Sequence, residues 1–153
     1  MELPTRSLAE LNEAANRLIA ELSPHPKTAT LITLSGELGA GKTTFVQAMA
    51  RTLGVEETVT SPTFVLEKIY KLEGRQFSHL VHIDAYRLKG AHELEALGWK
   101  ELLADSGNLI VLEWPERVAE VIPHDATRIT FDIVDDGRII TVDGQEKNGK
   151  NIV

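Results

Sequence analysis

Residues 36–44 form a glycine-rich segment whose residue types and spacing are suited to binding phosphate. Its first and last glycines, Lys42 and Thr43 match the pattern G-x-x-x-x-G-K-[ST]. Glycines let backbone N–H groups approach phosphate oxygens, the lysine ammonium can bridge the β- and γ-phosphates, and the threonine hydroxyl can ligate Mg²⁺. The segment therefore predicts a site for a nucleoside triphosphate with Mg²⁺, formed by Gly36, Glu37, Leu38, Gly39, Ala40, Gly41, Lys42, Thr43 and Thr44.

Two acidic residues stand directly after short apolar segments, where a strand would end. Asp84 follows residues 80–83, and Glu113 follows residues 109–112. Parallel strands end on the side of the sheet where ligands bind, so both carboxylates are expected near the phosphates. One would hold the metal, directly or through water, and the other would orient the attacking water; the sequence leaves open which. Taken singly, each fits an ordinary solvent-facing strand end equally well.

Three further features accompany these residues. The hydroxyl-rich residues Ser61 and Thr63 follow the phosphate-loop helix and fit a switch loop that senses the γ-phosphate, or a solvent loop whose hydroxyls cap turns. Trp114 follows Glu113 and fits either a place beside the nucleotide or plain core packing. His82 is interpreted as a strand histidine rather than a metal ligand, because no other histidine stands at metal-binding spacing.

The elements that must position these residues are predicted from apolar patterns. Residues 29–34 are a short apolar strand, and residues 43–53 an amphipathic helix ended by Gly54, so the phosphate loop joins a strand to a helix. A strand is also expected over 108–113, and helices over 7–22 and over 91–104 with a break near Gly98. Two hairpins are expected, one from strands 64–71 and 76–84 and one from strands 127–134 and 138–142.

These elements predict a small three-layer α/β fold of the P-loop NTPase-like type, with a mixed sheet that contains hairpins. We expect one ATPase domain over residues 1–144. The polar segment over residues 145–153 is expected to be a flexible tail.

Composition limits the class of protein. The chain has 153 residues, a net charge of −7, and no cysteine, which excludes disulfides and thiolate zinc sites. It has no apolar stretch long enough to cross a bilayer, and its first residues lack a basic segment followed by an apolar one, so a cytoplasmic location is expected. The basic residues are scattered along the chain and are outnumbered by acidic ones, so they are not expected to form a patch that binds phosphates. Any nucleic acid is therefore expected to be held by a partner.

Some classes of nucleotide-binding protein are disfavoured because the sequence lacks their characteristic motifs. The chain has neither the Asn-Lys-x-Asp motif of guanine-specific GTPases nor the Leu-Ser-Gly-Gly-Gln motif of transporter ATPases. A small-molecule kinase would need an arginine-rich lid, whereas the segment after Asp84 contains His92, Glu93 and Glu95.

Four motifs in order resemble those of the TsaE family, also called YjeE. They are residues 36–45, Ser-Pro-Thr-Phe at 61–64, His-Ile-Asp-Ala-Tyr-Arg-Leu at 82–88 and Glu-Trp-Pro-Glu at 113–116, and the similarity covers roughly residues 7–143. The resemblance implies a bacterial ATPase required for threonylcarbamoyladenosine at position 37 of tRNA. It also implies the partners TsaB and TsaD, with TsaD performing the transfer and contacting tRNA within the complex.

The resemblance also implies roles for single residues. Lys42 would contact phosphate, Thr43 and Glu113 would serve Mg²⁺, and Asp84 would be the Walker-B-like acid. Trp114 would lie beside ATP, and Ser61 and Thr63 would belong to the switch loop. Hydrolysis is expected to be weak without the partners. Two alternatives are an ATP-dependent binding module with incidental hydrolysis and a small-molecule kinase.

Overall fold

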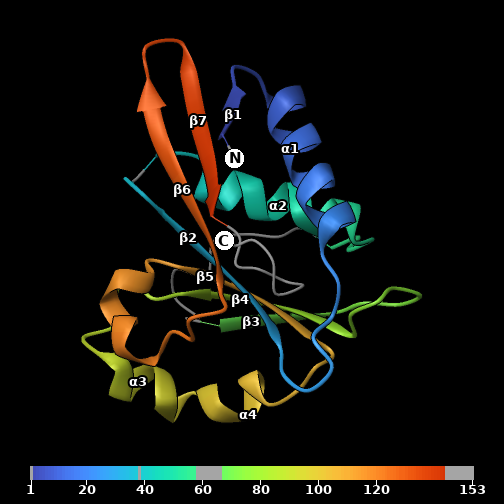
Figure 1. Cartoon of the computed structure of the whole chain (residues 1–153), viewed down its shortest axis with the longest axis vertical. Coiled ribbons are helices and arrows are strands. Elements are labelled where there is room, and N and C mark those ends of the chain that lie inside the picture. The colour runs from blue at the N-terminus through green and yellow to red at the C-terminus, as the bar shows by residue number, and fades with distance from the viewer. Residues whose placement is uncertain (1, 38, 58–66, 144–153) are drawn as a thin grey trace.

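The computed structural model describes residues 2–37, 39–57 and 67–143, and their strands form one seven-stranded sheet (Figure 1). The strands are β1 (Glu2–Thr5), β2 (Thr30–Gly36), β3 (Glu67–Lys71), β4 (His79–Asp84), β5 (Asn108–Glu113), β6 (Thr127–Val134) and β7 (Gly137–Asp143). The helices are α1 (Leu8–Glu21), α2 (Lys42–Thr52), α3 (Ala91–Ala96), α4 (Trp99–Leu103) and the 3₁₀-helix η1 (Pro115–Val121).

The sheet has a parallel centre with antiparallel edges. Its strand order is β1-β7-β6-β2-β5-β4-β3. Strand β2 runs parallel to β5 and β6, and β4 runs parallel to β5, whereas β7 pairs antiparallel with β6 and β1, and β3 with β4. Both predicted hairpins are present, and the predicted mixed sheet is confirmed.

Helices cover both faces of the sheet, as Figure 1 shows. Helices α1 and α2 lie on one face, over a core that includes Ile32, Leu34 and Val111. Helices α3 and α4 lie on the other face with η1, over a core that includes Ile110 and Leu112. Successive residues of β5 thus point into different cores, as the two-residue period of a strand requires. The predicted three-layer α/β fold is confirmed.

In the described residues, the predicted helices and strands agree with the structure except at particular ends; residues 64–66 of the strand predicted over 64–71 lie outside the described ranges. Helix α1 begins after Ser7, whose hydroxyl accepts a hydrogen bond from the Glu10 N–H at 3.1 Å. The helix predicted over 91–104 breaks at Gly98, which adopts a left-handed φ of 88°. Strand β4 begins at His79 rather than at residue 76, because the Ser78 N–H bonds to the Gly107 carbonyl and the turn extends to Ser78.

Two elements were not predicted. Strand β1 pairs with β7 at the edge of the sheet. It has only four residues and contains Pro4, so its sequence shows no alternating pattern typical of a strand. Proline is tolerated there because β1 is an edge strand. The 3₁₀-helix η1 begins at Pro115, within the Glu-Trp-Pro-Glu motif at 113–116. In the described part of the chain, no helix is long and apolar enough to cross a membrane. The predicted tail over 145–153 lies outside the described residues.

Candidate active site

The phosphate-loop segment joins the end of β2 to the start of α2. Strand β2 extends to Gly36, so the first glycine of the motif is still paired in the sheet, opposite Phe131 of β6. A Cβ atom at Gly36 would lie 2.7 Å from the Phe131 carbonyl oxygen, and only glycine fits this approach. Gly41 caps α2 with a φ of 101°, a left-handed conformation that glycine adopts without strain. Both glycines are therefore required by the path of the backbone.

The N-terminus of α2 lies at the end of this loop. The first N–H groups of a helix have no carbonyl partners within the helix, and the helix dipole places partial positive charge there. Helix α2 has no side-chain cap at Gly41, so no side chain of the cap competes for these N–H groups. This arrangement suits an anion such as phosphate.

Lys42, the first residue of α2, is buried, with 5% of its surface exposed. Its Nζ donates to the Gly36 carbonyl, lies 3.5 Å from the Glu37 carbonyl oxygen, and lies 3.8 Å from the centre of the Trp114 ring. Burial lowers the pKa of Lys42, while the charges of Glu113, Glu116 and Asp84 raise it in part. A buried ammonium beside three carboxylates forms the positive centre of the site.

Glu113 ends β5 with 3% of its surface exposed, and its carboxylate joins three elements. Oε2 accepts a hydrogen bond from His82 Nε2 of β4 at 2.6 Å. The same oxygen lies 3.4 Å from the Thr43 hydroxyl of α2. The structure thus places a predicted metal-binding carboxylate and a predicted metal-binding hydroxyl next to each other.

Asp84 ends the neighbouring strand and is the register partner of Glu113 in the parallel β4–β5 pair. Its Oδ1 accepts a hydrogen bond from the Tyr86 N–H at 2.9 Å. Burial raises the pKa of Asp84, and the Glu113 charge raises it further, while the Tyr86 hydrogen bond, His82 and Lys42 lower it. Both strand-end carboxylates therefore lie at the edge of the sheet where the phosphate loop begins.

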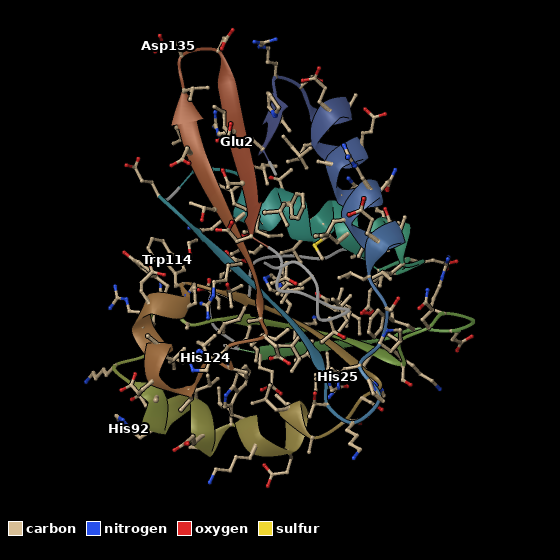
Figure 2. All side chains as sticks on the ribbon, in the orientation of Figure 1. Glu2, His25, His92, Trp114, His124 and Asp135 are labelled. Atoms are coloured by element: carbon tan, nitrogen blue, oxygen red, sulfur yellow. The ribbon has the colours of Figure 1, made fainter. Side chains whose placement is uncertain are left out.

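Trp114 lies where β5 passes into η1, on the side of the molecule where β2 ends (Figure 2). It is the only non-glycine residue with positive φ in the described ranges, at 63°, and its N–H donates to the Leu34 carbonyl at 3.1 Å. Its ring contacts Tyr86 at a centroid distance of 4.9 Å, and Arg117 lies 5.3 Å from the Tyr86 ring centre. Trp114 thus packs partly on the core and partly against Lys42.

Two residues of the site, His82 and Arg138, were not predicted to belong to it from the sequence. His82 is fully buried, and it contacts Glu113 rather than serving only to pack its strand. Its Nδ1 has no hydrogen-bond partner in the described structure. The signal was its position two residues before Asp84, which places both side chains on one face of β4. Arg138 of β7 contacts the phosphate loop, and no local pattern indicates this.

The donor set at Glu113 fits Mg²⁺ rather than a metal bound only by protein. The described residues contain no group of three or more His, Asp or Glu side chains that could hold a metal ion. Mg²⁺ is commonly held by one or two carboxylates together with phosphates and water. A hydroxyl and a buried carboxylate beside a phosphate loop match this requirement. Leu38, Ser61 and Thr63 lie outside the described residues, so their predicted contacts stay predictions.

Known proteins resemble the chain over most of its length. The family model for threonylcarbamoyl adenosine biosynthesis protein TsaE matches residues 5–140. The tRNA threonylcarbamoyladenosine biosynthesis protein TsaE of Haemophilus influenzae is 33% identical over 86% of this chain and 81% of its own length. The protein of the same name from Streptomyces coelicolor is 42% identical over 77% of this chain and 82% of its own length.

A solved structure also resembles the fold. The crystal structure of YdiB from Bacillus subtilis superposes with a TM-score of 0.76 at 28% sequence identity. The superposition covers 97% of this chain and 87% of that chain. The family model thus spans the phosphate loop and both strand-end carboxylates, and the superposition covers nearly the whole chain.

Proposed function

Because the chain belongs to the TsaE family of threonylcarbamoyl adenosine biosynthesis proteins, we propose that it is a P-loop ATPase subunit that binds and hydrolyses Mg-ATP to support tRNA modification at A37. Its partners in this proposal are the TsaB and TsaD homologues. The observation that carries the ATPase assignment is the contact of Thr43 and Glu113 at the head of the phosphate-loop helix. Thr43 and Glu113 would be the two protein ligands of Mg²⁺, and Lys42 would contact the phosphates of ATP.

The phosphate loop would bind the triphosphate through its backbone N–H groups and the N-terminus of α2. Lys42 would bridge the β- and γ-phosphates as a point charge. Its burial supports this role, because an ammonium removed from water interacts more strongly with an anion. Trp114 would form a wall of the site beside Lys42.

Glu113 is the better placed of the two carboxylates for the metal. Its Oε2 is near the Thr43 hydroxyl, whereas Asp84 has a hydrogen bond to the Tyr86 N–H and none to the described residues of the loop. Thr43 and Glu113 would hold Mg²⁺, which neutralises charge that develops on the phosphate oxygens when it is bound. The contact with Thr43 thus supports Glu113 as the metal ligand, a choice that the sequence left open.

Asp84 would then orient the attacking water and accept its proton. Its side chain lies on the same face of β4 as His82, next to Glu113 and at the edge where the loop begins. Partial burial raises the pKa of Asp84, which makes its carboxylate a stronger base than a solvent-exposed aspartate. Asp84, Glu113 and Lys42 are the catalytic residues of the proposal.

His82 fixes the orientation of Glu113 in this scheme, and its replacement should therefore weaken the response to metal. In His82→Leu, Glu113 loses its 2.6 Å hydrogen bond and keeps only the longer contact with Thr43. Such supporting contacts change metal affinity by roughly 10- to 100-fold, so the Mg²⁺ concentration for half-maximal hydrolysis should rise by at least about 10-fold. The measurement is a Mg²⁺ titration of phosphate release at saturating ATP.

The control for this prediction is His82→Gln, whose amide nitrogen can donate a hydrogen bond as His82 Nε2 does. The glutamine variant should recover part of the metal affinity that the leucine variant loses. Metal-free ADP binding should be unchanged in both, since His82 contacts no described residue of the phosphate loop. An unaltered Mg²⁺ titration in His82→Leu would show that Glu113 needs no support from His82.

The remaining parts of the proposal concern the whole chain. One sheet contains strands from Glu2 to Asp143, which supports a single ATPase domain over residues 1–144. The net charge of −7 favours contact with tRNA mainly through the partner complex. We propose a cytoplasmic location, where tRNA modification by this family would take place.

The test of the proposed function is phosphate release from ATP and GTP, with and without the TsaB and TsaD homologues. We expect slow release from ATP by the isolated chain, faster release with the partners, and little release from GTP. ATP labelled with ³²P at the γ-position should yield free phosphate and no labelled acceptor. Label on a metabolite would favour the small-molecule kinase, and release that no partner stimulates would contradict the assignment.

A further inference from the structure

Arg138, near the start of β7, forms hydrogen bonds with the phosphate loop from the opposite end of the chain. Its Nε donates to the Ala40 carbonyl and its Nη2 to the Gly39 carbonyl, both at 3.1 Å. Its Nη1 donates to the Gly137 carbonyl of its own strand at 3.1 Å. The β6–β7 hairpin, with Asp135 at its tip, is thereby connected to the loop between β2 and α2 (Figure 2).

These bonds set the direction of two consecutive peptide groups. In a planar trans peptide group, the C=O and the N–H point in opposite directions. The carbonyls of Gly39 and Ala40 face Arg138, so the N–H groups of Ala40 and Gly41 point away from it. The Ala40 N–H bonds to the Glu37 carbonyl at 3.1 Å within the loop. The Gly41 N–H is directed to the side of the loop opposite Arg138, beside the first turn of α2.

Besides Arg138, these peptide groups are held by the buried Ala40 side chain and by the Ala40 N–H bond to the Glu37 carbonyl, whereas the two flanking glycines have no side chain to anchor them. Gly39 and Gly41 have positive φ values of 82° and 101°, and a Cβ at either position would meet no atom within 4 Å. Open space on the side-chain side leaves these two glycines without a packing restraint there, and a glycine backbone has the widest choice of conformations. A planar guanidinium with several fixed donors can restrain two carbonyls at once, whereas a lysine ammonium provides a single point charge.

We propose that Arg138 is a positioning residue of the phosphate loop. It holds the Gly39–Ala40 and Ala40–Gly41 peptide groups so that the Ala40 N–H stays bonded to the Glu37 carbonyl and the Gly41 N–H is directed toward bound phosphate. This inference rests on the proposed nucleotide binding and adds the hairpin as a determinant of affinity. A guanidinium on the carbonyl side also polarises the two peptide groups, which strengthens the Gly41 N–H as a donor to phosphate. Arg138 does not itself touch the reacting atoms in this role.

The test compares ADP affinity in Arg138→Met with that of the wild-type protein by titration calorimetry. Methionine keeps an apolar stem and removes all the donors. The dissociation constant should rise by about 10-fold or more, because hydrogen bonds from a charged donor are about twice as strong as neutral ones. At saturating ATP the hydrolysis rate should fall much less than KM rises, since the chemistry of Lys42 and Glu113 is retained. Arg138→Lys should recover only part of the affinity.

The matched control is Arg6→Met, which removes another arginine that contacts the same hairpin. Arg6 Nε pairs with Asp136 at 3.3 Å, and both side chains are exposed, so ADP affinity should be unchanged. In Arg138→Ala, millimolar guanidinium ion should restore affinity, which a purely structural role for Arg138 would not predict.

Three outcomes would overturn the inference. The first is wild-type affinity in Arg138→Met. The second is a loss of affinity that guanidinium does not rescue and that accompanies a matching fall in Tm, because Arg138 would then only attach the hairpin to the fold. The third is absence of nucleotide binding in the wild-type protein, which would refute the proposed function itself and is distinguished from the other two by the wild-type titration alone.

Discussion

Glu113→Gln is expected to lower the rate of ATP hydrolysis by at least about 100-fold, because a bound metal supplies several kcal/mol of transition-state stabilisation and 1.36 kcal/mol is a tenfold change in rate. Glutamine has nearly the volume of glutamate but no charge with which to hold Mg²⁺. The variant should still bind ADP, since Lys42 and the loop backbone are intact. The measurement is single-turnover hydrolysis in excess Mg²⁺, with ADP affinity measured in parallel.

Glu116→Gln is the matched control for this experiment. Glu116 is exposed and its charge influences Lys42, but it has no contact with Thr43 among the described residues. Its variant should hydrolyse ATP at nearly the wild-type rate. If Glu113→Gln also kept the wild-type rate, the proposed metal site would be wrong. If Asp84→Asn instead raised the Mg²⁺ requirement and Glu113→Gln did not, the roles of the two carboxylates would be exchanged.

Lys42→Ala should lose most nucleotide affinity and nearly all hydrolysis. Hydrogen bonds to charged groups contribute about 1.5–3 kcal/mol each, which corresponds to a rise of about 10- to 100-fold in the dissociation constant of ATP. The loss in rate should be greater, because a preorganised charge acts most strongly on charge that develops in the transition state. Both quantities can be measured by titration with ATP in EDTA and by phosphate release with Mg²⁺.

The stability of Lys42→Ala separates this loss from unfolding. Burial lowers the pKa of Lys42, which means that the folded protein holds this ammonium at a cost. Its removal should leave Tm unchanged or slightly higher. Lys68→Ala is the control, because Lys68 also lies over an aromatic ring, at 5.8 Å from the Tyr70 centre, but is exposed on the edge strand β3. Wild-type ATP affinity in Lys42→Ala would contradict the proposed phosphate contact.

Features carried by short contiguous patterns were predictable from the sequence. The phosphate loop, the apolar strand before it and the helix after it are each encoded within a few residues. The strand ends at Asp84 and Glu113 were placed correctly because unbroken apolar segments precede them. Their proximity followed from the rule that parallel strands end together. The family assignment, based on four ordered motifs, is confirmed by the matching family model.

Features that depend on distant contacts were not predictable in this way. The contact of Arg138 with the loop joins residues almost a hundred positions apart, and it depends on how the β6–β7 hairpin lies over the loop. The contact of His82 with Glu113 depends on the register of β4 and β5. The left-handed conformation of Trp114 is unusual for a large side chain and has no sequence signal.

We propose that ATP hydrolysis, and not ATP binding alone, supports repeated tRNA modification. The most direct test counts threonylcarbamoyladenosine formed per TsaD homologue in the reconstituted system with the TsaB homologue, tRNA and ATP. With the wild-type chain we predict many modified tRNAs per complex. With Glu113→Gln, which is expected to bind ATP but to hydrolyse it at least about 100-fold more slowly, product should stop near one per complex on the time scale of the wild-type reaction. Continued multiple turnover with Glu113→Gln, with hydrolysis shown to be absent, would contradict the claim and favour a binding module.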